Sequence, residues 1–535
     1  MARARRSPMR NRRSASRASS LAGSSSDLIR GRARAGGSCS GVGVAPEPTG
    51  PLRRFWERPP ATRPAIRLVR DPLPRTTRQP DRLPRMSERV TNENAVDQAL
   101  DALRALGIAA GEVFLREAQS GSVEIKDGAI DSVIARGERG IGIRVLEEQR
   151  LGFAYTSDLS TDGIRACADT ARRMSGVTEA DKDLALATRP IDDADLDIYQ
   201  AGIVNRALVE RGNVALAVED AARATDPRVT QFRKTTYSDS ESTTIIATTT
   251  GMRGSYRESY CGAMTSAVAT QDGERQIGYH GEAGRRFADL DPKRVGEQAA
   301  RRAVEKLGAR ALSTQKLPVV LDPWMAMDLL RAIGPLFSAD NVLKGRSLFA
   351  SKVGQRVASE RVTIVDDARR PRGLRSAPFD GEGVATTTQT LIDRGVLRGY
   401  LTSLKTARKL GVEPSGNARR GGYGSPSRVG TSNLYIDAGT DDTAAIARGL
   451  DRALAITSLL NLHTIDPVSG EFSLGATGNY LERGLRSHPV QGITIAGNLT
   501  QLLGAIVAVG TDLVFGPSGL GSPTLVISEL SIGGA

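Results

Sequence analysis

Residues 345–411 read GRSLFASKVGQRVASERVTIVDDARRPRGLRSAPFDGEGVATTTQTLIDRGVLRGYLTSLKTARKLG. Within this stretch, the segment LIDRGVLRGYL predicts two strands joined by a tight turn at Asp393-Arg394-Gly395. Gly395 can take the positive φ that a short hairpin requires. The polar run at 402–409 predicts a helix, and Gly411 is expected to end it. The stretch therefore predicts a tight hairpin followed by a short helix.

Outward from this stretch, helical and strand-like hydrophobic periods alternate. Asp322 followed by Pro323 predicts a helix start, because aspartate caps a helix and proline suits its first position. Lys126-Asp127-Gly128 predicts a hairpin turn between β-like runs. The sequence predicts an α+β fold of two domains, 86–312 and 313–535, with mostly antiparallel sheets and packed helices. The expected helices are 92–106, 161–174, 205–224, 292–307, 324–336 and 442–460.

The net charge of +13 is concentrated at the start of the chain. Residues 1–85 hold 20 Arg and 5 acidic residues, whereas the remainder holds 53 basic and 55 acidic residues. This Arg-, Ser-, Pro- and Gly-rich extension has too few apolar residues to fold, so we expect it to be disordered. It is interpreted first as an over-extended start with Met86 as the first residue, then as a transit peptide, and last as a nucleic-acid-binding arm. The near-neutral remainder argues against nucleic-acid binding and gives no sign of membrane binding.

Cysteine usage and hydropathy indicate a cytoplasmic protein. The three cysteines, Cys39, Cys167 and Cys261, form no CxxC motif and no disulfide framework, which suits a reducing compartment. The longest apolar run, which begins at Leu502, is too short to span a bilayer.

Several sequence blocks occur in the order found in one known family. After the opening stretch come PSGNARR (414–420), TSNLYI (431–436), SGEFSLGATGNYLERG (469–484) and HPVQGITIAGNL (488–499). Together they resemble the TldD/TldE (PmbA) family, long labelled "modulator of DNA gyrase", over most of residues 86–535. Several such blocks in one order are far more specific than any short motif.

The resemblance implies where zinc ligands would stand. TldD-type members are zinc metalloproteases with a HExxxH-like motif on a helix and a further cysteine ligand near the C-terminus. The matching segment here, DLLRAIGPLFSAD (328–340), contains no His, Glu or Cys, and residues 509–525 contain no Cys. The resemblance thus implies a TldE (PmbA)-like subunit with no catalytic and no metal-binding residue of its own.

The same resemblance implies a partner and a substrate class. A TldD-like zinc metalloprotease subunit would form a heterodimer with this chain and supply the zinc and the general base. This chain would help to enclose a small or unfolded polypeptide, such as a peptide-antibiotic precursor or an antitoxin. We expect such a peptide to add as a strand to a sheet edge.

Other candidate residues are weighed against ordinary structural roles. His280, beside Glu282, is interpreted as a hydrogen-bonded or exposed histidine at a strand end rather than as part of a metal or acid–base pair. His463 is expected to follow a helix and His488 to lie in a loop before Pro489. Four carboxylates are expected to shape turns, namely Asp366, Asp367, Asp380 and Glu382; without a third ligand they make at best a weak hard-cation site.

The segment GNARRGGYG (416–424) joins two arginines to glycine-exposed amides. Such a loop can cradle a phosphate or a carboxylate, although it lacks the Lys-Ser/Thr ending of a P-loop. We interpret it as a surface or channel loop, and the family resemblance implies that it lies near the inter-subunit groove, where Arg419, Arg420 and Tyr423 would bind a peptide and the arginines would grip its terminus.

Two alternatives from other classes remain open. One is a non-enzymatic regulatory protein associated with DNA gyrase or nucleic acid, which predicts salt-sensitive DNA binding. The other is an independent hydrolase built on Glu282, His280 or the acidic residues near Asp380. Stoichiometric zinc on the isolated chain would favour this last alternative.

Overall fold

The computed structural model describes residues 91–189 and 194–534. The predicted extension, residues 1–85, lies outside the described residues, and the predicted domain boundary at 312/313 stays a prediction. The α+β class with mostly antiparallel sheets and packed helices is confirmed. Within the described part of the chain, no helix combines the length and the apolar character needed to cross a bilayer.

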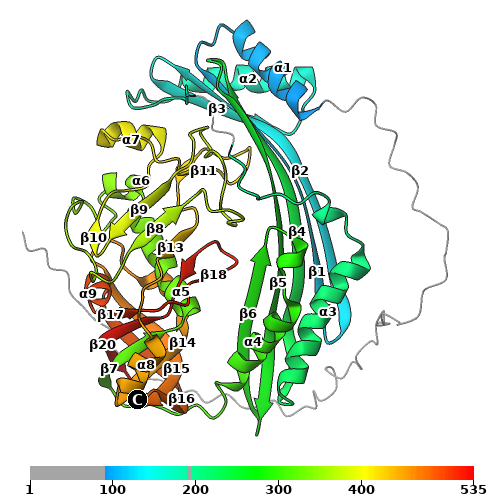
Figure 1. Cartoon of the computed structure of the whole chain (residues 1–535). Helices are drawn as coiled ribbons and strands as arrows, with labels where there is room; N and C mark the ends of the chain where they lie inside the picture. Colours follow the sequence, from blue (N-terminus) through cyan, green and yellow to red (C-terminus); the bar gives the residue numbers. More distant parts are fainter. Residues whose placement is uncertain (1–90, 190–193, 535) are drawn as a thin grey trace, which may run out of the picture. The chain divides into compact units, whose positions relative to one another are not determined.

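The N-terminal sheet is antiparallel throughout, in the order β3-β2-β1-β4-β5-β6. Its long central strands curve side by side (Figure 1). The predicted turn is confirmed, because Asp127 and Gly128 both have positive φ between β1 and β2. The strands are β1 (Gly111–Lys126), β2 (Ala129–Glu147), β3 (Arg150–Thr156), β4 (Val229–Thr248), β5 (Arg253–Gln271) and β6 (Glu274–Gly284).

Four helices cover this sheet in two pairs. Helices α1 (Asn92–Ala105) and α2 (Thr161–Ser175) bury apolar residues against β1 and β2. Helices α3 (Leu208–Thr225) and α4 (Pro292–Val304) pack on β4, β5 and β6. Figure 1 shows the first pair at one end of the sheet and the second pair farther along it. All four helices were predicted within a few residues of their ends.

The C-terminal part contains two six-stranded sheets and a small hairpin. One sheet runs β16-β15-β14-β7-β20-β17, and β20 also pairs with β16; the other runs β10-β9-β8-β13-β19-β18. The bounds are β7 Gln315–Leu321, β8 Ile364–Asp367, β9 Thr388–Asp393, β10 Val396–Leu397, β11 Ala418–Arg419, β12 Arg428–Val429, β13 Leu434–Ile436, β14 Arg452–Leu460, β15 Glu471–Glu482, β16 Leu485–Asn498, β17 Ile506–Val509, β18 Val514–Phe515, β19 Gly521–Ser522 and β20 Leu525–Gly533.

Short helices connect these strands and share one large core with them. Asp322 caps α5, with its carboxylate accepting from the N–H of Met325, and Pro323 is the first helical residue, as predicted. Leu330, Ile333 and Phe337 are fully buried in that core. The α-helices of the C-terminal part are α5 (Pro323–Ile333), α6 (Ala339–Leu343), α7 (Leu404–Leu410), α8 (Thr443–Gly449) and α9 (Leu499–Gly504). The 3₁₀ turns of this part are Gly334–Phe337 and Leu462–Thr464, and those among the N-terminal elements are Ile203–Asn205 and Phe287–Asp289.

The predicted helix at 442–460 is wrong. The chain forms the short helix α8 and then the strand β14, which lies between β7 and β15. Leu454 and Ile456 lie two residues apart and are both buried, so a strand satisfies this apolar run as well as a helix does. Pairing with two neighbouring strands decides between the two periods.

Candidate functional site

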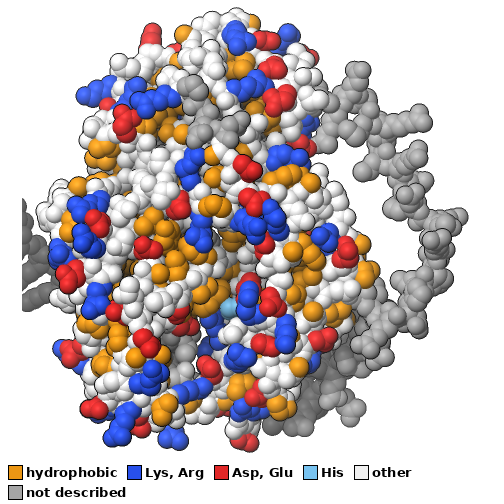
Figure 2. All heavy atoms as spheres, viewed as in Figure 1, with side chains coloured by type: hydrophobic (Ala, Val, Ile, Leu, Met, Phe, Trp, Pro, Cys, Tyr) orange, Lys and Arg blue, Asp and Glu red, His pale blue; other side chains and the backbone are white. Residues whose placement is uncertain are grey.

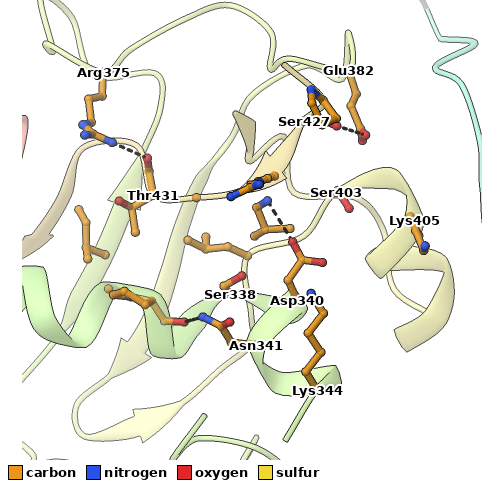
Figure 3. A pocket seen from close by; sticks show the side chains of 18 of the residues that line it. Ser338, Asp340, Asn341, Lys344, Arg375, Glu382, Ser403, Lys405, Ser427 and Thr431 are labelled. Carbon is orange, nitrogen blue, oxygen red and sulfur yellow. Dashed lines mark hydrogen bonds between the residues drawn. The ribbon is translucent and has the colours of Figure 1, made fainter. Parts of the chain in front are cut away.

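A cavity of about 1040 Å³ lies between the N-terminal sheet and the C-terminal part. We call it the main cavity. Its walls come from β2 and β3 on one side and from α5, α6, the β11–β12 hairpin and the loops around Glu382 and Ser403 on the other. Figure 3 shows Ser338, Asp340 and Asn341 pointing toward this space from α6 and the residue before it.

The segment that the family resemblance singles out, residues 328–340, forms one wall of the main cavity. It comprises the end of α5, a 3₁₀ turn and the start of α6. Asn341 donates to the carbonyl of Pro335 at 2.9 Å and fixes the bend between them. The carboxylate of Asp340 accepts from the N–H of Val429 at 3.3 Å, which ties α6 to the β11–β12 hairpin.

The residues present do not fit a zinc ion. A catalytic zinc site needs three protein ligands, chosen from imidazole, thiolate and carboxylate groups. The segment offers two carboxylates: Asp328 lies 3.5 Å from the guanidinium of Arg331, and Asp340 is bound as described above. Among residues 91–189 and 194–534, no group of three His, Cys, Asp or Glu side chains is placed to hold a metal.

The lining of the main cavity is rich in positive charge. Its basic residues are Arg144, Arg331, Lys344, Arg375, Lys405 and Arg428, against the acidic residues Asp340 and Glu382. Arg144, Arg331 and Lys405 are held in ion pairs with acidic residues. In the described part of the chain, Lys344, Arg375 and Arg428 have no carboxylate within ion-pair distance, so the cavity favours a ligand with negative charge.

A buried cluster of four charged side chains joins the N-terminal sheet to the C-terminal part. Glu112 on β1 binds the guanidinium groups of both Arg144 on β2 and Arg420 after β11. Arg144 also donates to Glu382 at 3.1 Å. We call Glu112, Arg144, Glu382 and Arg420 the ionic cluster. Their side chains are at most 6% exposed, so their charges depend on one another rather than on water.

The pKa values in the ionic cluster follow from this pairing. Burial acts to raise the pKa of Glu112, but Arg144 and Arg420 hold it below its usual value. Burial acts to lower the pKa of Arg144, but Glu112 and Glu382 raise it. Glu382 accepts further hydrogen bonds from Ser427 at 2.6 Å and from the N–H of Leu404 at 2.9 Å. Each member of the ionic cluster is therefore partnered by other protein groups, although one nitrogen of Arg420, described below, has no acceptor among the described residues.

The predicted peptide-binding residues lie close together beside the ionic cluster. Arg419 and Arg420 line a second, smaller cavity of about 230 Å³. Tyr423 packs against β2, where a side chain on Gly140 would come within 2.4 Å of its ring, and it also contacts Tyr155 edge-on. The loop is therefore anchored to the N-terminal sheet at two points, by the ion pair of Arg420 with Glu112 and by the packing of Tyr423 on β2. The peptide-binding role of Arg419, Arg420 and Tyr423 stays a prediction.

Two of the four carboxylates expected to shape turns, Asp380 and Asp367, do so, whereas Glu382 belongs to the ionic cluster. Asp380 accepts from the N–H groups of Glu382, Val384 and Ala418; burial and the neighbouring Glu382 raise its pKa to about 7. Asp367 accepts from the N–H of Arg369 at 3.0 Å. Asp366 was expected to cap the same turn, but it is fully buried and binds Asn417 and Ser432 instead. It holds β8 to the segments around 417 and 432.

His280 lies near the end of β6, where it is buried rather than exposed and forms a hydrogen bond with Glu282 at 3.3 Å. Arg294 donates two hydrogen bonds of 2.5 Å to Glu282, and the ring of Trp324 lies 4.7 Å from that of His280. Burial lowers the pKa of His280. This carboxylate is occupied by a guanidinium, which leaves it poorly placed to act as a base.

The positions predicted for the other histidines need correction. His463 follows the strand β14 rather than a helix, because the helix predicted there does not form. His488 lies within β16, paired with Tyr480 on β15, rather than in a loop. Strand backbone is compatible with Pro489, since proline confines its predecessor to extended conformations.

The described cysteines are structural. Burial raises the pKa of Cys167 to about 11 and that of Cys261 to about 12. A thiol of such high pKa holds little of the reactive thiolate at neutral pH.

Sequence reasoning missed three residues of the site. Glu112 and Arg144 sit in ordinary strand patterns, and nothing local marks them as partners of Arg420. Arg375 belongs to the run ARRPRGLRS, and this concentration of arginines could have marked it as a candidate binding residue. It lines both cavities.

Comparison with protein-family models places three matches along the chain. They are PmbA/TldA metallopeptidase domain 1 at residues 111–175, the central domain at 204–307 and the C-terminal domain at 314–534. Together these cover most of the chain.

Curated relatives and solved structures are similar over nearly their whole length. Metalloprotease PmbA of Escherichia coli O157:H7 is 27% identical over 84% of this chain and 97% of its own. A metalloprotease TldD homolog of Haemophilus influenzae is 28% identical over 79% and 92%. A Thermotoga maritima protein described as a modulator of a DNA gyrase has a TM-score of 0.76 and 29% identity, covering 83% of this chain and all of that one. TldE of Thermococcus kodakarensis, at 20% identity and a TM-score of 0.74 over 83% and 99%, shows the same fold.

Proposed function

Because this chain belongs to the PmbA/TldD metallopeptidase family, we propose that it is the TldE-like, zinc-free subunit of a two-subunit cytoplasmic metalloprotease. Its role is to bind and enclose a small or unfolded peptide, while a TldD-like partner supplies the zinc ion and the general base. Relatives named PmbA and relatives named TldD have comparable sequence identity to this chain, so overall similarity does not distinguish the two subunit types. The distinction has to come from the residues of the site.

The observation that carries the proposal is the lining of the main cavity. Residues 328–340, which match the zinc-binding helix of TldD-type members, border a space of about 1040 Å³, yet contribute Arg331, Ser338 and Asp340 to it rather than imidazoles. The volume is large enough for a ligand, and the side chains that line it can form hydrogen bonds and attract charged groups. Such a site favours binding over metal chemistry.

The position of β3 supports binding of an extended chain. Among the strands that the structure describes, β3 pairs only with β2, so its other edge has no strand partner, although Thr178 donates to the carbonyl of Leu151 at 3.1 Å. Leu151 and Phe153 of β3 line the main cavity. An extended peptide lying there can add to this edge through its backbone and place alternate side chains in the cavity.

The test is reconstitution of the two subunits. The full chain is co-expressed with the TldD-like homologue from the same genome, and the purified complex is assayed with an unstructured peptide. We expect a stable complex whose peptidase activity disappears with a chelator and returns with zinc. Changing the glutamate of the partner's HExxxH-like motif to glutamine should abolish cleavage while the complex still forms.

Cleavage by this chain alone, surviving a chelator, would contradict the assignment of the chemistry to the partner. A DNA-binding measurement on the full chain and on a version starting at Met86 separates the proposal from a nucleic-acid role. On the face shown in Figure 2, basic and acidic side chains of the described residues are interspersed, so we expect no salt-sensitive DNA binding by the shorter version.

A further inference from the structure

The smaller cavity lies directly beside the main cavity. It holds about 230 Å³, roughly eight times the volume of one water molecule in the liquid. Arg375 and Thr431 line both spaces, so a ligand in one is next to the other. We call the smaller space the arginine cavity, since Arg116, Arg375, Arg419 and Arg420 line it.

Two of these arginines carry buried donors with no acceptor. The Nε and Nη2 atoms of Arg419 and the Nη1 atom of Arg420 are covered, yet have no hydrogen-bond partner among the described residues. Buried polar groups are normally paired, and an orphaned donor in a native structure calls for an explanation. These three donors belong to two residues that line the arginine cavity, which points to a ligand that accepts hydrogen bonds.

The charges around the arginine cavity do not balance. Asp380 is occupied by three backbone N–H groups, and Glu258 is bound by Arg285 at 3.1 Å with Arg116 at 3.5 Å. Arg375 and Arg419 have no carboxylate within ion-pair distance in the described part of the chain. The buried Asp366 acts on both of these arginines through its charge but forms no ion pair with either, so neither guanidinium has a directly bound carboxylate at the boundary between the two cavities.

Arg375 is held in place without an anion. Its Nε atom donates to the carbonyl of Ser518 at 2.8 Å and its Nη1 atom to that of Thr431 at 3.3 Å, as Figure 3 shows for the latter. Burial and the nearby charge of Arg419 lower the pKa of Arg375. The guanidinium groups of Arg375 and Arg419 are thus held near each other although their charges repel, and a bound anionic ligand would reduce this repulsion.

The remaining wall of the arginine cavity is apolar and aromatic. Phe114, Tyr256, Ala377 and Phe379 line it, and the rings of Tyr256 and Phe379 meet edge-on at 5.0 Å. The guanidinium of Arg420 lies 4.5 Å from the ring of Phe114, which holds it in position. The cavity therefore pairs anion-binding groups with a surface suited to an apolar side chain.

Resting on the function proposed above, we propose that the arginine cavity is a subsite for the C-terminal carboxylate of a peptide lying in the main cavity. Arg419 binds the carboxylate, Arg375 and Arg420 complete its surroundings, and the aromatic wall receives the last side chain. A planar carboxylate matches the paired donors of a guanidinium. The substrate class is thus peptides bound close to their free C-terminus and ending in an apolar residue.

Direct binding to the full chain tests the subsite. The probe is a fluorescently labelled unstructured hexapeptide ending in phenylalanine, compared with the same peptide carrying a C-terminal amide and with one whose internal glutamate is replaced by glutamine. We expect amidation to weaken binding about tenfold or more, because it removes a charge-assisted contact. Replacing the internal glutamate should change binding far less; the reverse pattern would assign the site to acidic side chains and overturn the proposal.

Variants locate the effect on Arg419. Arg419→Gln should weaken binding of the free acid to the level of the amide and leave the amide unaffected, while Arg419→Lys should restore part of the affinity. Arg233→Gln is the matched control, since it removes an equal charge from an exposed position on β4. Thermal melting of each variant shows that it is folded. Equal binding of acid and amide by the unmodified chain would overturn the subsite.

The reconstituted complex separates this inference from the proposed function. With Arg419→Gln in place, we expect KM for a free-acid substrate to rise about tenfold, with kcat retained and with no change for the amidated substrate. A complex that forms and cleaves both substrates equally, with or without Arg419, would refute the subsite and leave the proposed function standing. Failure of the wild-type chains to form an active complex would instead refute the proposed function.

Discussion

Arg419 and Arg420 are neighbours in one hairpin and line one cavity, yet they differ in what compensates their charge. Arg420 is paired with Glu112 of the N-terminal sheet and its side chain is 1% exposed. Among the described residues, Arg419 has no such partner, and two of its covered nitrogens lack an acceptor. The difference separates a charge that holds the protein together from one that is available to a ligand.

The pairing of Arg420 belongs to a larger structural device. The ionic cluster connects β1 and β2 to the loop at Glu382 and to the β11–β12 hairpin, segments separated by more than two hundred residues in sequence. Removing one partner from such a buried group is costly, because the others remain charged without compensation. Removing Arg419 breaks no ion pair among the described residues, although the buried Asp366 loses a favourable nearby charge.

The largest effect is expected at Glu112. Glu112→Gln leaves Arg144 and Arg420 without their shared carboxylate, and we expect the free energy of unfolding to fall by about 3–5 kcal/mol. Chemical denaturation of the full chain measures this. Glu529→Gln is the control, since Glu529 pairs with Lys316 in an exposed ion pair and should change stability by no more than about 1 kcal/mol. Equal effects at the two sites would show that the ionic cluster is not a structural link.

The second prediction sets the two arginines against each other. Arg420→Met should lower the free energy of unfolding by about 2–3 kcal/mol, because Glu112 loses one of its two partners. Arg419→Met should leave stability unchanged or raise it by about 1 kcal/mol, because it removes donors that have no acceptor. Thermal melting of both variants tests this prediction. A similar loss of stability in both would contradict the difference between the two arginines.

The third prediction concerns the contact that anchors the hairpin loop to β2. A Cβ at Gly142 would lie 2.2 Å from the carbonyl oxygen of Tyr423, so Gly142→Ala has to displace this loop. We expect a loss of about 1–3 kcal/mol and faster proteolytic cleavage between β11 and β12. Gly137→Ala, on the same strand, meets nothing closer than 4.0 Å and is the control. Unchanged proteolysis in Gly142→Ala would contradict the anchoring role.

Sequence reasoning was most reliable where the backbone itself constrains the residue. The predicted turn at 393–395 forms, with φ of +43° at Arg394 and +80° at Gly395, and Gly411 ends α7 at +67°. Glycine tolerates these values at little cost, so the turns are readable from the sequence. The segment 442–460 failed because its apolar residues fit two periods, and only pairing with β7 and β15 selects the strand.

The site was only partly readable for the same reason. The arginines of GNARRGGYG stood out beside four glycines, and the structure brings Arg419 and Arg420 to one cavity. Nothing in the sequence distinguishes one from the other, because the distinction rests on Glu112, three hundred residues away. Compensation of a buried charge is a long-range property, so it emerges only from the fold.

The smallest effect is expected at a half-buried ion pair elsewhere on the boundary between the N-terminal sheet and the C-terminal part. Burial acts to raise the pKa of Glu282, but hydrogen bonds from His280 and Arg294 lower it to about 2. A depressed pKa means that the unfolded chain takes up the proton first, so the stabilisation is present above about pH 4.5 and is lost as the pH falls toward 2. Burial lowers the pKa of His280, with Arg302 and Arg294 acting in the same direction and Glu282 opposing them.

The lowered pKa of His280 also destabilises the fold in acid, but at higher pH. The folded protein keeps this imidazole neutral, whereas the unfolded chain binds a proton below about pH 6.5. We expect the free energy of unfolding to fall between pH 7 and pH 5, with a slope of at most about 1.4 kcal/mol per pH unit, the limit for one proton. The melting temperature should fall over the same pH range. His280→Gln should flatten this region, and His463→Gln, which removes an exposed imidazole, should not. Because Asp322 faces the same cavity as His280 and burial raises its pKa, an opposite slope would show that the carboxylate rather than the imidazole governs this boundary.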